Sequence, residues 1–486
     1  MNKCYQFAFS LCALLVLAAA SGAAISGQVA DRLSEVKKLY LGSLGHDKGA
    51  AEMREQLVRK LRKTRAVEIV SDPKNADAVV RGTGRIWVTG HFSLSPRSHS
   101  LDGSTFSGFL SAEVVGRNDE TLWSYLVTPS KFLWKDLPDD LAGQLVSKLL
   151  VALKGNAHQE PGFAGSVAQP EGMLTGAGST FSAPLYLRWF ESFQELYPEV
   201  HFTYDGVGSA EGIERLKEGR VDFGASDMPL SDRAMSEAYQ HVVQVPTVLG
   251  AVVVVYNVKG LRQTLNFTPD ILSGIYLGTV NKWNDPQIKK SNPGATLPDS
   301  PITVVHRSDG SGTTFVWTDY LSKISPDWRT SVGVGTSVPW PVGIGAEHNE
   351  GVASAVQRTA NSIGYVEFIY AVQHELSFGA VRNSSGEFIK ASISSVTAAA
   401  TRTTVTPDQD LRVSITNPPF KAAYPIATYT WLLIPDLKED KNKNVALTQF
   451  VRWALTSGQK KCSALGYVPL PEDIAHLALK YFDSKK

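Results

Sequence analysis

The chain has 486 residues, with 48 Lys and Arg against 47 Asp and Glu, so its formal net charge is +1. Such a balance argues against nucleic acid or an anionic membrane as the main partner, because both are bound through an excess of positive charge. Any affinity for a small anion must therefore come from local geometry. This length predicts roughly three domain-sized units.

Residues 1–24 have the pattern of a secretory signal peptide. Lys3 supplies the positive charge, an apolar run reaches Ala20, and small residues permit cleavage after Ala20, Ala23 or Ala24. The run is too short for a membrane helix, which needs roughly 20 apolar residues, and no later stretch approaches that length. We expect a periplasmic or secreted protein that does not insert into the membrane once the signal is removed.

Two of the three cysteines, Cys4 and Cys12, lie in this signal. A lipid anchor on Cys12 is the alternative to soluble export, but Phe9-Ser10-Leu11 lacks the small residues expected before a lipidated cysteine. Removal of the signal leaves Cys462 alone, so no intramolecular disulfide can form. Its apolar surroundings predict a buried residue.

Residues 26–155 are predicted to form a small α+β domain. The expected strands are 37–41, 67–70, 78–88, 109–115 and 121–127, and the expected helices are 49–63 and 139–153. The basic residues of the first helix, such as Arg54 and Lys60, have no interleaved aromatic residues, so a solvated helix face explains them better than a nucleic-acid site. No catalytic set is assembled here, and a docking role is left open.

The segment 156–172 is rich in Gly, Pro and polar residues, which predicts a linker. Beyond it strands and helices alternate, as in a doubly wound α/β fold that binds ligands beyond the carboxyl ends of its strands. The continuous apolar run 248–257 predicts a parallel strand covered on both faces.

Three segments of this α/β region are rich in Gly, Ser and Thr: 175–184, 205–230 and 304–315. Each lies where a turn enters a predicted helix. Free N–H groups at a helix start carry partial positive charge and bind phosphate-like anions. Glycine lets the anion approach closely, and hydroxyls add donors without net charge. Together with Arg307 and Asp227, these segments predict a site for a small tetrahedral oxyanion.

The residues that carry a family resemblance are TGAGSTFSAPLY, YDGVGS, VDFGASDMPLSD, VPTVLGAVVVVYN, IYLGTVNKWNDP, VHRSDGSGTTFVWTDYL, VPWPVGIGAEHNEGVA and IGYVEFIYA. From about 174 to 470 the chain closely resembles the periplasmic phosphate-binding protein of the ABC phosphate importer. The resemblance implies a type II-like periplasmic-binding-protein fold with two crossovers, whose α/β lobes clamp one phosphate. It gives lobe one as 172–246 plus 424–486 and lobe two as 247–423, with the N-terminal domain outside it.

Carried over position by position, the family's phosphate contacts fall on Thr180, Phe181, Ser209, Asp227, Arg307, Ser311, Gly312 and Thr313. Phe181 is expected to contribute its backbone N–H, and Asp309 to orient Arg307. The chain departs from the family pattern at Ser182, where Pro is common, and at Ala210-Glu211, where Ser-Gly is usual. We expect Glu211 to turn sideways and complement the helix macrodipole rather than face the ligand.

Asp227 is the residue that predicts selectivity. Phosphate near neutral pH still carries a hydrogen, so it can donate a short, strong O–H···O⁻ bond to an ionised carboxylate. Sulfate has no such hydrogen and would meet repulsion. Sites built on an obligatory hydrogen bond reject the analogue that lacks it by about 10⁴-fold or more.

The expected function is an exported, monomeric solute-binding protein, without metal, cofactor or catalytic residues, that delivers inorganic phosphate to the membrane permease of an ABC importer. The lobes should move about the crossovers 246–250 and 420–424.

The alternatives are a secreted phosphate-ester hydrolase and a phosphate-sensing or adhesion protein on the same scaffold. Against a hydrolase, the chain lacks a nucleophile elbow, a two-metal spacing and a P-loop. His306 adjoins Arg307 on a strand and should therefore point away from the site.

Overall fold

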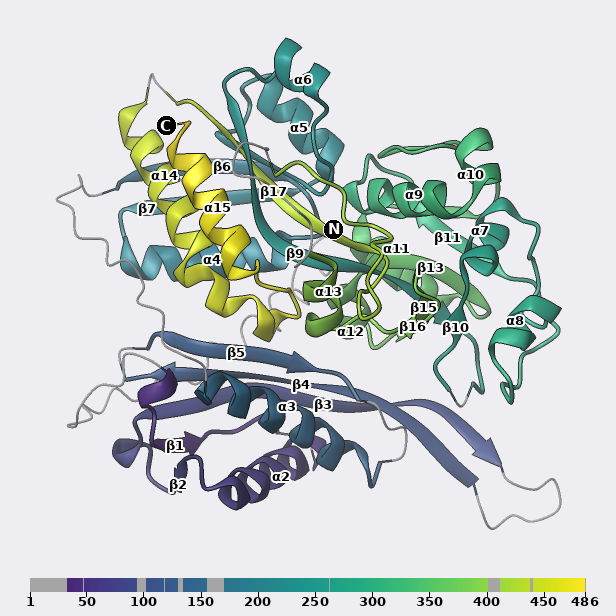
Figure 1. The fold of residues 1–486 in the computed structure, drawn as a ribbon, viewed down its shortest axis with the longest axis horizontal. Helices are drawn as coiled ribbons and strands as arrows, with labels where there is room; N and C mark the ends of the chain where they lie inside the picture. The colour runs from purple at the N-terminus through teal and green to yellow at the C-terminus, as the bar shows by residue number, and fades with distance from the viewer. Residues whose placement is uncertain are drawn as a thin grey trace.

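The structure is a computed structural model that describes residues 33–46, 48–93, 102–117, 119–129, 134–154, 170–261, 263–400, 411–437 and 440–485. The predicted signal peptide and most of the predicted linker lie outside these residues. Figure 1 shows a small α+β layer beneath a larger two-lobed α/β part.

The N-terminal domain is an α+β sandwich, as expected. Its elements are η1 (Leu33–Glu35), β1 (Lys38–Leu41), α2 (Lys48–Thr64), β2 (Glu68–Val70), η2 (Pro73–Asn75), β3 (Ala78–Ser93), β4 (Asp102–Gly116), β5 (Thr121–Val127) and α3 (Leu137–Lys154). The strand order is β2-β1-β3-β4-β5, with β1 parallel to β2 and β3 and the rest antiparallel. Buried positions of α2, such as Met53, Leu57 and Leu61, recur every four residues and pack on α3 and the sheet.

The hairpin β3–β4 is longer than the sequence pattern predicts. The expected strands ended at 88 and began at 109, but the ladder continues to the pair Ser93 and Asp102, past an irregularity between Val88 and Gly90. Residues 89–93 lack the apolar alternation that marks a half-buried strand, so only the pairing itself reveals them.

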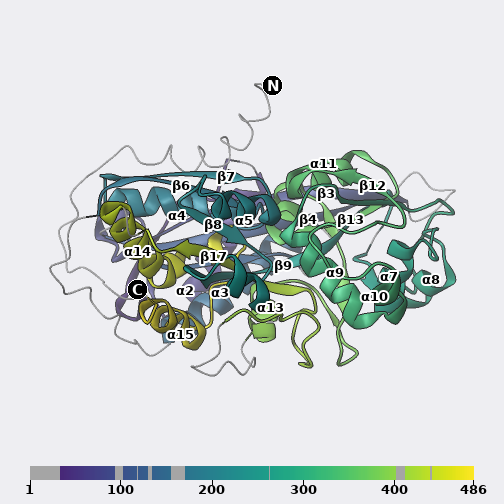
Figure 2. The ribbon, with the colours of Figure 1, turned by 90° about the horizontal axis from the view of Figure 1, so that it is seen from above.

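Lobe one forms half of the larger part. Its elements are β6 (Gly172–Gly178), α4 (Ala183–Leu196), β7 (Val200–Gly206), α5 (Ser209–Lys217), β8 (Phe223–Ser226), α6 (Asp232–Glu237), β17 (Ala427–Pro435), α14 (Lys441–Leu455), η3 (Ser457–Lys461), η4 (Ser463–Leu465) and α15 (Glu472–Asp483). Figure 2 shows α4, α14 and α15 on one side of β9 and β17, with the helices of lobe two on the other.

Lobe two follows in the chain. Its elements are β10 (Asn266–Phe267), α7 (Pro269–Leu277), α8 (Pro286–Ser291), β11 (Thr303–Arg307), α9 (Gly312–Ile324), α10 (Pro326–Ser331), β12 (Ile344–Ala346), α11 (His348–Arg358), β13 (Ser362–Glu367), α12 (Phe368–Gln373), β14 (Ser377–Phe378), β15 (Ala380–Arg382), β16 (Phe388–Ile389) and α13 (Ile393–Ala400). A small sheet, β10-β15-β16, lies apart from the main one.

The lobes are joined by the long strand β9 (Val242–Asn257). The main sheet runs β12-β11-β13-β9-β17-β8-β6-β7, with β14 also on β9. The prediction of a parallel strand here is wrong, because β9 is antiparallel to β13, β14 and β17. Nearly all of β9 is buried, so its apolar run reflects coverage on both faces rather than the direction of its partners. The expected crossover 246–250 lies within β9, opposite an irregularity between Thr430 and Trp431.

The N-terminal sheet contacts both lobes. On lobe one, Ser111 Oγ donates to Ala464 O and Ser124 Oγ to Lys460 O, each at 2.5 Å. On lobe two, side chains of β3 reach Glu375, just after α12. In Figure 1 the layer of β3, β4 and β5 accordingly extends beneath both lobes.

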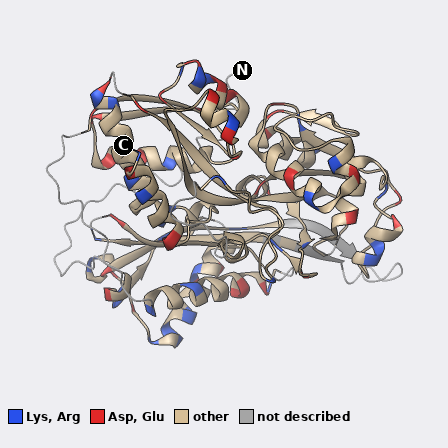
Figure 3. Cartoon of the chain, turned by 45° about the horizontal axis from the view of Figure 1, so that its top comes forward, with Lys and Arg blue, Asp and Glu red and all other residues tan. Residues whose placement is uncertain are grey.

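Charges of both signs are interspersed along the outer helices in the view of Figure 3. Within the described ranges, no helix combines the length and the hydrophobicity that crossing a membrane requires. Cys462, the cysteine within those ranges, is buried, as its apolar surroundings predicted.

Candidate functional site

The predicted anion-binding segments lie at the carboxyl ends of parallel strands. β6 pairs in parallel with β7 and β8, and β11 pairs in parallel with β12 and β13. The chain leaves these strands and enters α4, α5 and α9. Ser311 caps α9 by accepting from Thr314 N at 3.0 Å. The local fold thus directs helix starts from both lobes toward one interface.

Asp227, directly after β8, is the buried acid of this interface. It is 1% exposed. Its carboxylate accepts from Ser179 Oγ at 2.7 and 2.8 Å, from Thr430 Oγ1 at 2.6 Å and from Ser209 Oγ at 3.4 Å. Burial raises the pKa of Asp227 to about 6, while these hydroxyls and the charge of Arg307 act in the opposite direction. These are three hydroxyl donors, since Ser179 is shared between the two oxygens, and a carboxylate has about four acceptor positions, so one remains for a ligand.

Arg307, at the end of β11, is the buried cation. It is 2% exposed, and its Nε donates to Asp309 Oδ1 at 2.6 Å while Nη2 binds the other oxygen. Burial acts to raise the pKa of Asp309, but the hydrogen bonds and charge of Arg307 outweigh it and lower that pKa. Among the described residues, Arg307 Nη1 is buried without a hydrogen-bond partner. A buried guanidinium with an unpaired N–H group fits a site for an anion.

The two lobes touch at these loops. Ala210 N of lobe one donates to Gly310 O of lobe two at 3.2 Å. Gly312 lies so close that an added Cβ would stand 2.3 Å from Ser209 Oγ and 2.6 Å from Asp227 Oδ2. The structure is therefore a closed arrangement of the lobes.

The structure places the remaining predicted residues at or next to this interface. Thr180 and Thr313, on opposite lobes, are both buried and both accept from Asn349 Nδ2. The Phe181 N–H donates to Ser179 Oγ at 3.0 Å, so it is already satisfied and would have to exchange that partner to reach an anion.

Sequence reasoning missed several buried polar residues here. Ser179 and Thr430 both bind Asp227, and Asn349 joins the two threonines. Thr430 carried a signal that could have been used, because it is a polar residue inside the apolar run of β17.

Glu367 was missed as well. It is fully buried at the end of β13, where its Oε2 accepts from Ile369 N at 2.7 Å and caps α12. Burial raises its pKa well above the ordinary value, and the charge of Asp227 raises it further. Burial thus favours the neutral form of Glu367, which reduces the negative charge near Asp227.

Of the residues that depart from the family pattern, Ala210 lies in the lobe contact itself, whereas the Glu211 side chain turns sideways. Glu211 pairs with Arg215 Nε at 2.8 Å and is half-buried, with its carboxylate turned sideways as expected. His306 stacks on Trp340, with ring centroids 4.7 Å apart, in agreement with its predicted orientation. Ser182 precedes α4, and its Oγ is buried without a hydrogen-bond partner in the described part of the chain.

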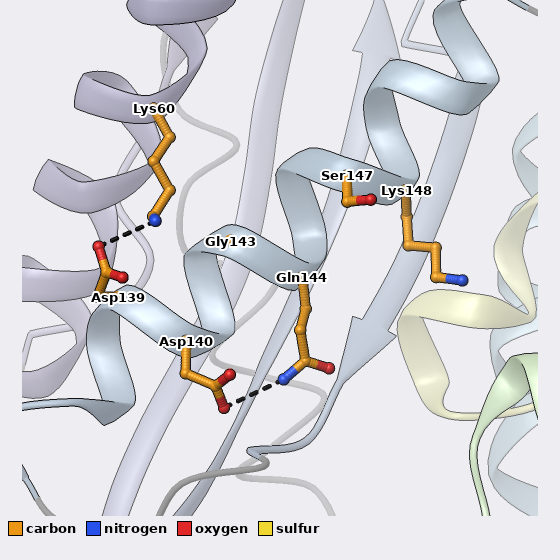
Figure 4. Close-up of a pocket in the computed structure, with 7 residues that line it drawn as sticks. All are labelled: Lys60, Asp139, Asp140, Gly143, Gln144, Ser147 and Lys148. Carbon is orange, nitrogen blue, oxygen red and sulfur yellow. Dashed lines mark hydrogen bonds and ion pairs between the residues drawn. The ribbon is translucent and has the colours of Figure 1, made fainter.

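A hollow of about 450 Å³ lies elsewhere, between α2 and α3 of the N-terminal domain (Figure 4). Lys60 pairs with Asp139 at 2.9 Å there, and Gln144 Nε2 donates to Asp140 Oδ2 at 3.2 Å. These groups satisfy one another, which agrees with a solvated helix face. Over the described ranges, no cluster of His, Cys, Asp and Glu side chains is placed to hold a metal.

Comparison with known proteins identifies relatives of the larger, C-terminal part of the chain. A family model described as "PBP superfamily domain" matches residues 164–457. The chain is 39% identical over 313 residues to a protein of Xylella fastidiosa named "Phosphate-binding protein PstS", covering 64% of this chain and 85% of that protein. It is 37% identical over 330 residues to a protein of the same name from Methanocaldococcus jannaschii, covering 63% and 85%.

Solved structures share the fold of a similar share of the chain. A DING protein crystal structure matches with a TM-score of 0.52 at 19% identity, covering 62% of this chain and 92% of the other. A periplasmic phosphate-binding protein, PfluDING, matches with a TM-score of 0.51 at 20% identity, covering 63% and 92%. Residues before 164 lie outside the family model.

Proposed function

The chain belongs to the phosphate-binding proteins of the PBP superfamily, and on that premise we propose that it captures inorganic phosphate between its lobes and delivers it to an ABC importer. The observation that carries the proposal is the meeting of buried Asp227 and buried Arg307, one from each lobe, at a single closed interface. The guanidinium of Arg307 can pair with the negative oxygens of phosphate, and the carboxylate of Asp227 can accept a hydrogen bond from the hydrogen that phosphate still carries.

The charges of the site are nearly balanced by the protein itself. Arg307 is held by Asp309, and Asp227 is surrounded by neutral hydroxyls. The anion is therefore stabilised mainly by oriented donors in a dry environment, where hydrogen bonds are electrostatically stronger than in water. This reliance on neutral donors agrees with the near-zero net charge of the chain.

The proposed donors to phosphate come from both lobes. They are Thr180, Phe181 and Ser209 of lobe one and Arg307, Ser311, Gly312 and Thr313 of lobe two, with Asp227 as the acceptor. The support is their position at helix starts on the two sides of the contact, together with the unpaired Arg307 Nη1. Glu211 takes no part in this arrangement.

We further propose that the protein works outside the cytoplasm as a monomer, with a membrane permease as its partner and without nucleic acid, metal or cofactor. The support is the signal-like residues 1–24, the balanced charge and the names of the relatives. On this proposal the protein is a carrier, not an enzyme.

Calorimetry with phosphate and sulfate side by side tests the proposal. Phosphate should bind, and sulfate should bind at least about 10⁴-fold more weakly. Phosphate should also reduce the scattering radius of an open ligand-free population. Absence of phosphate binding, or equal affinity for the two anions, would overturn the proposal. Incubation with a chromogenic phosphate ester should show no turnover, and turnover would favour a hydrolase.

A further inference from the structure

Asn349, in the first turn of α11, holds a fixed orientation at the lobe contact. The residue is fully buried. Its Oδ1 accepts from the backbone N–H of Glu367 at 3.0 Å. A backbone N–H can only donate, so this bond sets which end of the amide is oxygen. The Nδ2 end must therefore face the other way.

The Nδ2 group of Asn349 donates to the hydroxyl oxygens of two threonines. It lies 3.0 Å from Thr180 Oγ1 and 3.1 Å from Thr313 Oγ1. An amide NH₂ cannot accept, so each hydroxyl acts as an acceptor in these bonds. Each hydroxyl proton is then left for another acceptor. Thr180 and Thr313 are 6% and 1% exposed, so water has little access to them.

The contact joins two lobes. Asn349 and Thr313 belong to lobe two, and Thr180 belongs to the loop between β6 and α4 of lobe one. The bond to Thr180 therefore requires the closed arrangement. When the lobes part, Thr180 loses this donor and its hydroxyl can rotate.

We propose that Asn349 is a positioning residue that aims the hydroxyl protons of Thr180 and Thr313 at the bound anion and does so fully only on closure. The inference rests on the proposed function, because it takes inorganic phosphate as the anion. By occupying the acceptor lone pairs, the amide makes both hydroxyls donors toward the ligand, and it adds no charge.

The direction of these hydrogen bonds gives a sharp test. Asn349→Asp keeps the shape but replaces the NH₂ by an acceptor, so both threonines would turn their protons to the carboxylate and away from phosphate. A buried negative charge would be added beside the anion. Asn349→Ala removes the donor without reversing it. Asn349→Asp should weaken phosphate binding by about 100-fold or more, and Asn349→Ala by about 10-fold.

The matched control is Asn292→Ala in the same lobe. Asn292 is also buried and uses its amide in similar hydrogen bonds, but with the backbone of Asn266 and Ile288 instead of site hydroxyls. Its substitution should lower the thermal midpoint of the ligand-free protein about as much as Asn349→Ala does. It should leave phosphate release unchanged.

Calorimetry and stopped-flow release of inorganic phosphate provide the readouts. Asn349→Ala should raise the release rate and leave the association rate within about twofold, because the contact forms after encounter. Thr313→Val should cost less in the Asn349→Ala background than in the wild type. If Asn349→Asp does not fold, these two measurements decide.

The role of Asn349 would be overturned if Asn349→Asp bound phosphate as tightly as the wild type. It would also be overturned if Asn349→Ala released phosphate at the wild-type rate and Thr313→Val cost the same in both backgrounds. Either outcome would leave the proposed function intact. Failure of the wild type itself to bind phosphate would overturn the proposed function.

Discussion

The indole Nε1–H of Trp87 donates to the backbone carbonyl of Glu375 at 3.1 Å. Trp87 lies on β3 of the N-terminal domain, and Glu375 follows α12 of lobe two. Arg85, two residues earlier, pairs with the Glu375 carboxylate at 2.9 Å. Because the same sheet is bonded to lobe one at Lys460 and Ala464, the domain outside the family match ties both lobes together in the closed arrangement.

Weakening this tie is expected to favour opening. The double substitution Trp87→Phe and Arg85→Ala removes a hydrogen bond and a half-exposed ion pair, together worth about 1–2 kcal/mol. Phosphate release, measured by stopped flow, should become roughly 5- to 30-fold faster. Arg81→Ala is the control, because Arg81 pairs with Asp119 at 2.8 Å within the N-terminal domain. Equal release rates in the wild type and the double variant would show that the domain does not hold the lobes.

Asp227→Ala is expected to erode discrimination more than affinity. Sulfate would no longer meet a carboxylate, while phosphate would lose one hydrogen bond among several. The ratio of the sulfate and phosphate dissociation constants should fall by about 100-fold or more. Competition titration measures this ratio directly, and an unchanged ratio would remove Asp227 from the selectivity mechanism.

The same carboxyl predicts a pH dependence of selectivity. Burial raises the pKa of Asp227 from 3.8 to about 6 in the ligand-free protein. Below that pH the protonated acid can donate to sulfate, so the sulfate-to-phosphate ratio of dissociation constants should drop at least about 10-fold between pH 7.5 and 5. In Asp227→Asn the ratio should not follow this titration. A ratio independent of pH in the wild type would contradict the assignment.

Asp227 also predicts how the stability of the ligand-free protein depends on pH. The dependence is opposite to that of a salt-bridged acid, whose lowered pKa stabilises the folded protein at high pH. Because the folded pKa lies above the unfolded one, the folded protein binds the proton more tightly. The contribution of Asp227 to ligand-free stability is therefore greatest below pH 4 and is lost as the pH rises through about 6. Denaturant midpoints of the wild type and Asp227→Asn, compared across this window, should converge at low pH. Parallel curves would be inconsistent with the raised pKa.

Gly312→Ala is expected to prevent closure. The added methyl would occupy the space of Ser209 Oγ and Asp227 Oδ2. Phosphate affinity should fall at least about 100-fold, while the ligand-free protein unfolds at nearly the same temperature, since alanine is favoured in a helix. Gly351→Ala on α11 is the control, because its nearest contact would be an ordinary 3.7 Å. Scattering that still shows compaction in Gly312→Ala would refute the steric argument.

The N-terminal elements and the anion-binding loops could be recognised along the chain because their signals are local. Apolar spacing sets α2, and glycines and hydroxyl residues mark the starts of α5 and α9. The direction of β9 could not be obtained in this way. A strand covered on both faces has the same apolar pattern whichever way its neighbours run, and its partner β17 lies far along the chain.

The sequence by itself identified Asp227, Arg307 and the loops around them as candidates for an anion site. This was possible because charge and helix-start chemistry belong to single residues and short segments. Tertiary structure decided what those groups meet. The amide of Asn349 reaches Thr180 and Thr313, and Trp87 reaches Glu375, only after distant segments pack together. Hydrogen bonds are short and directional, so no pattern of spacing along the chain can specify such partners.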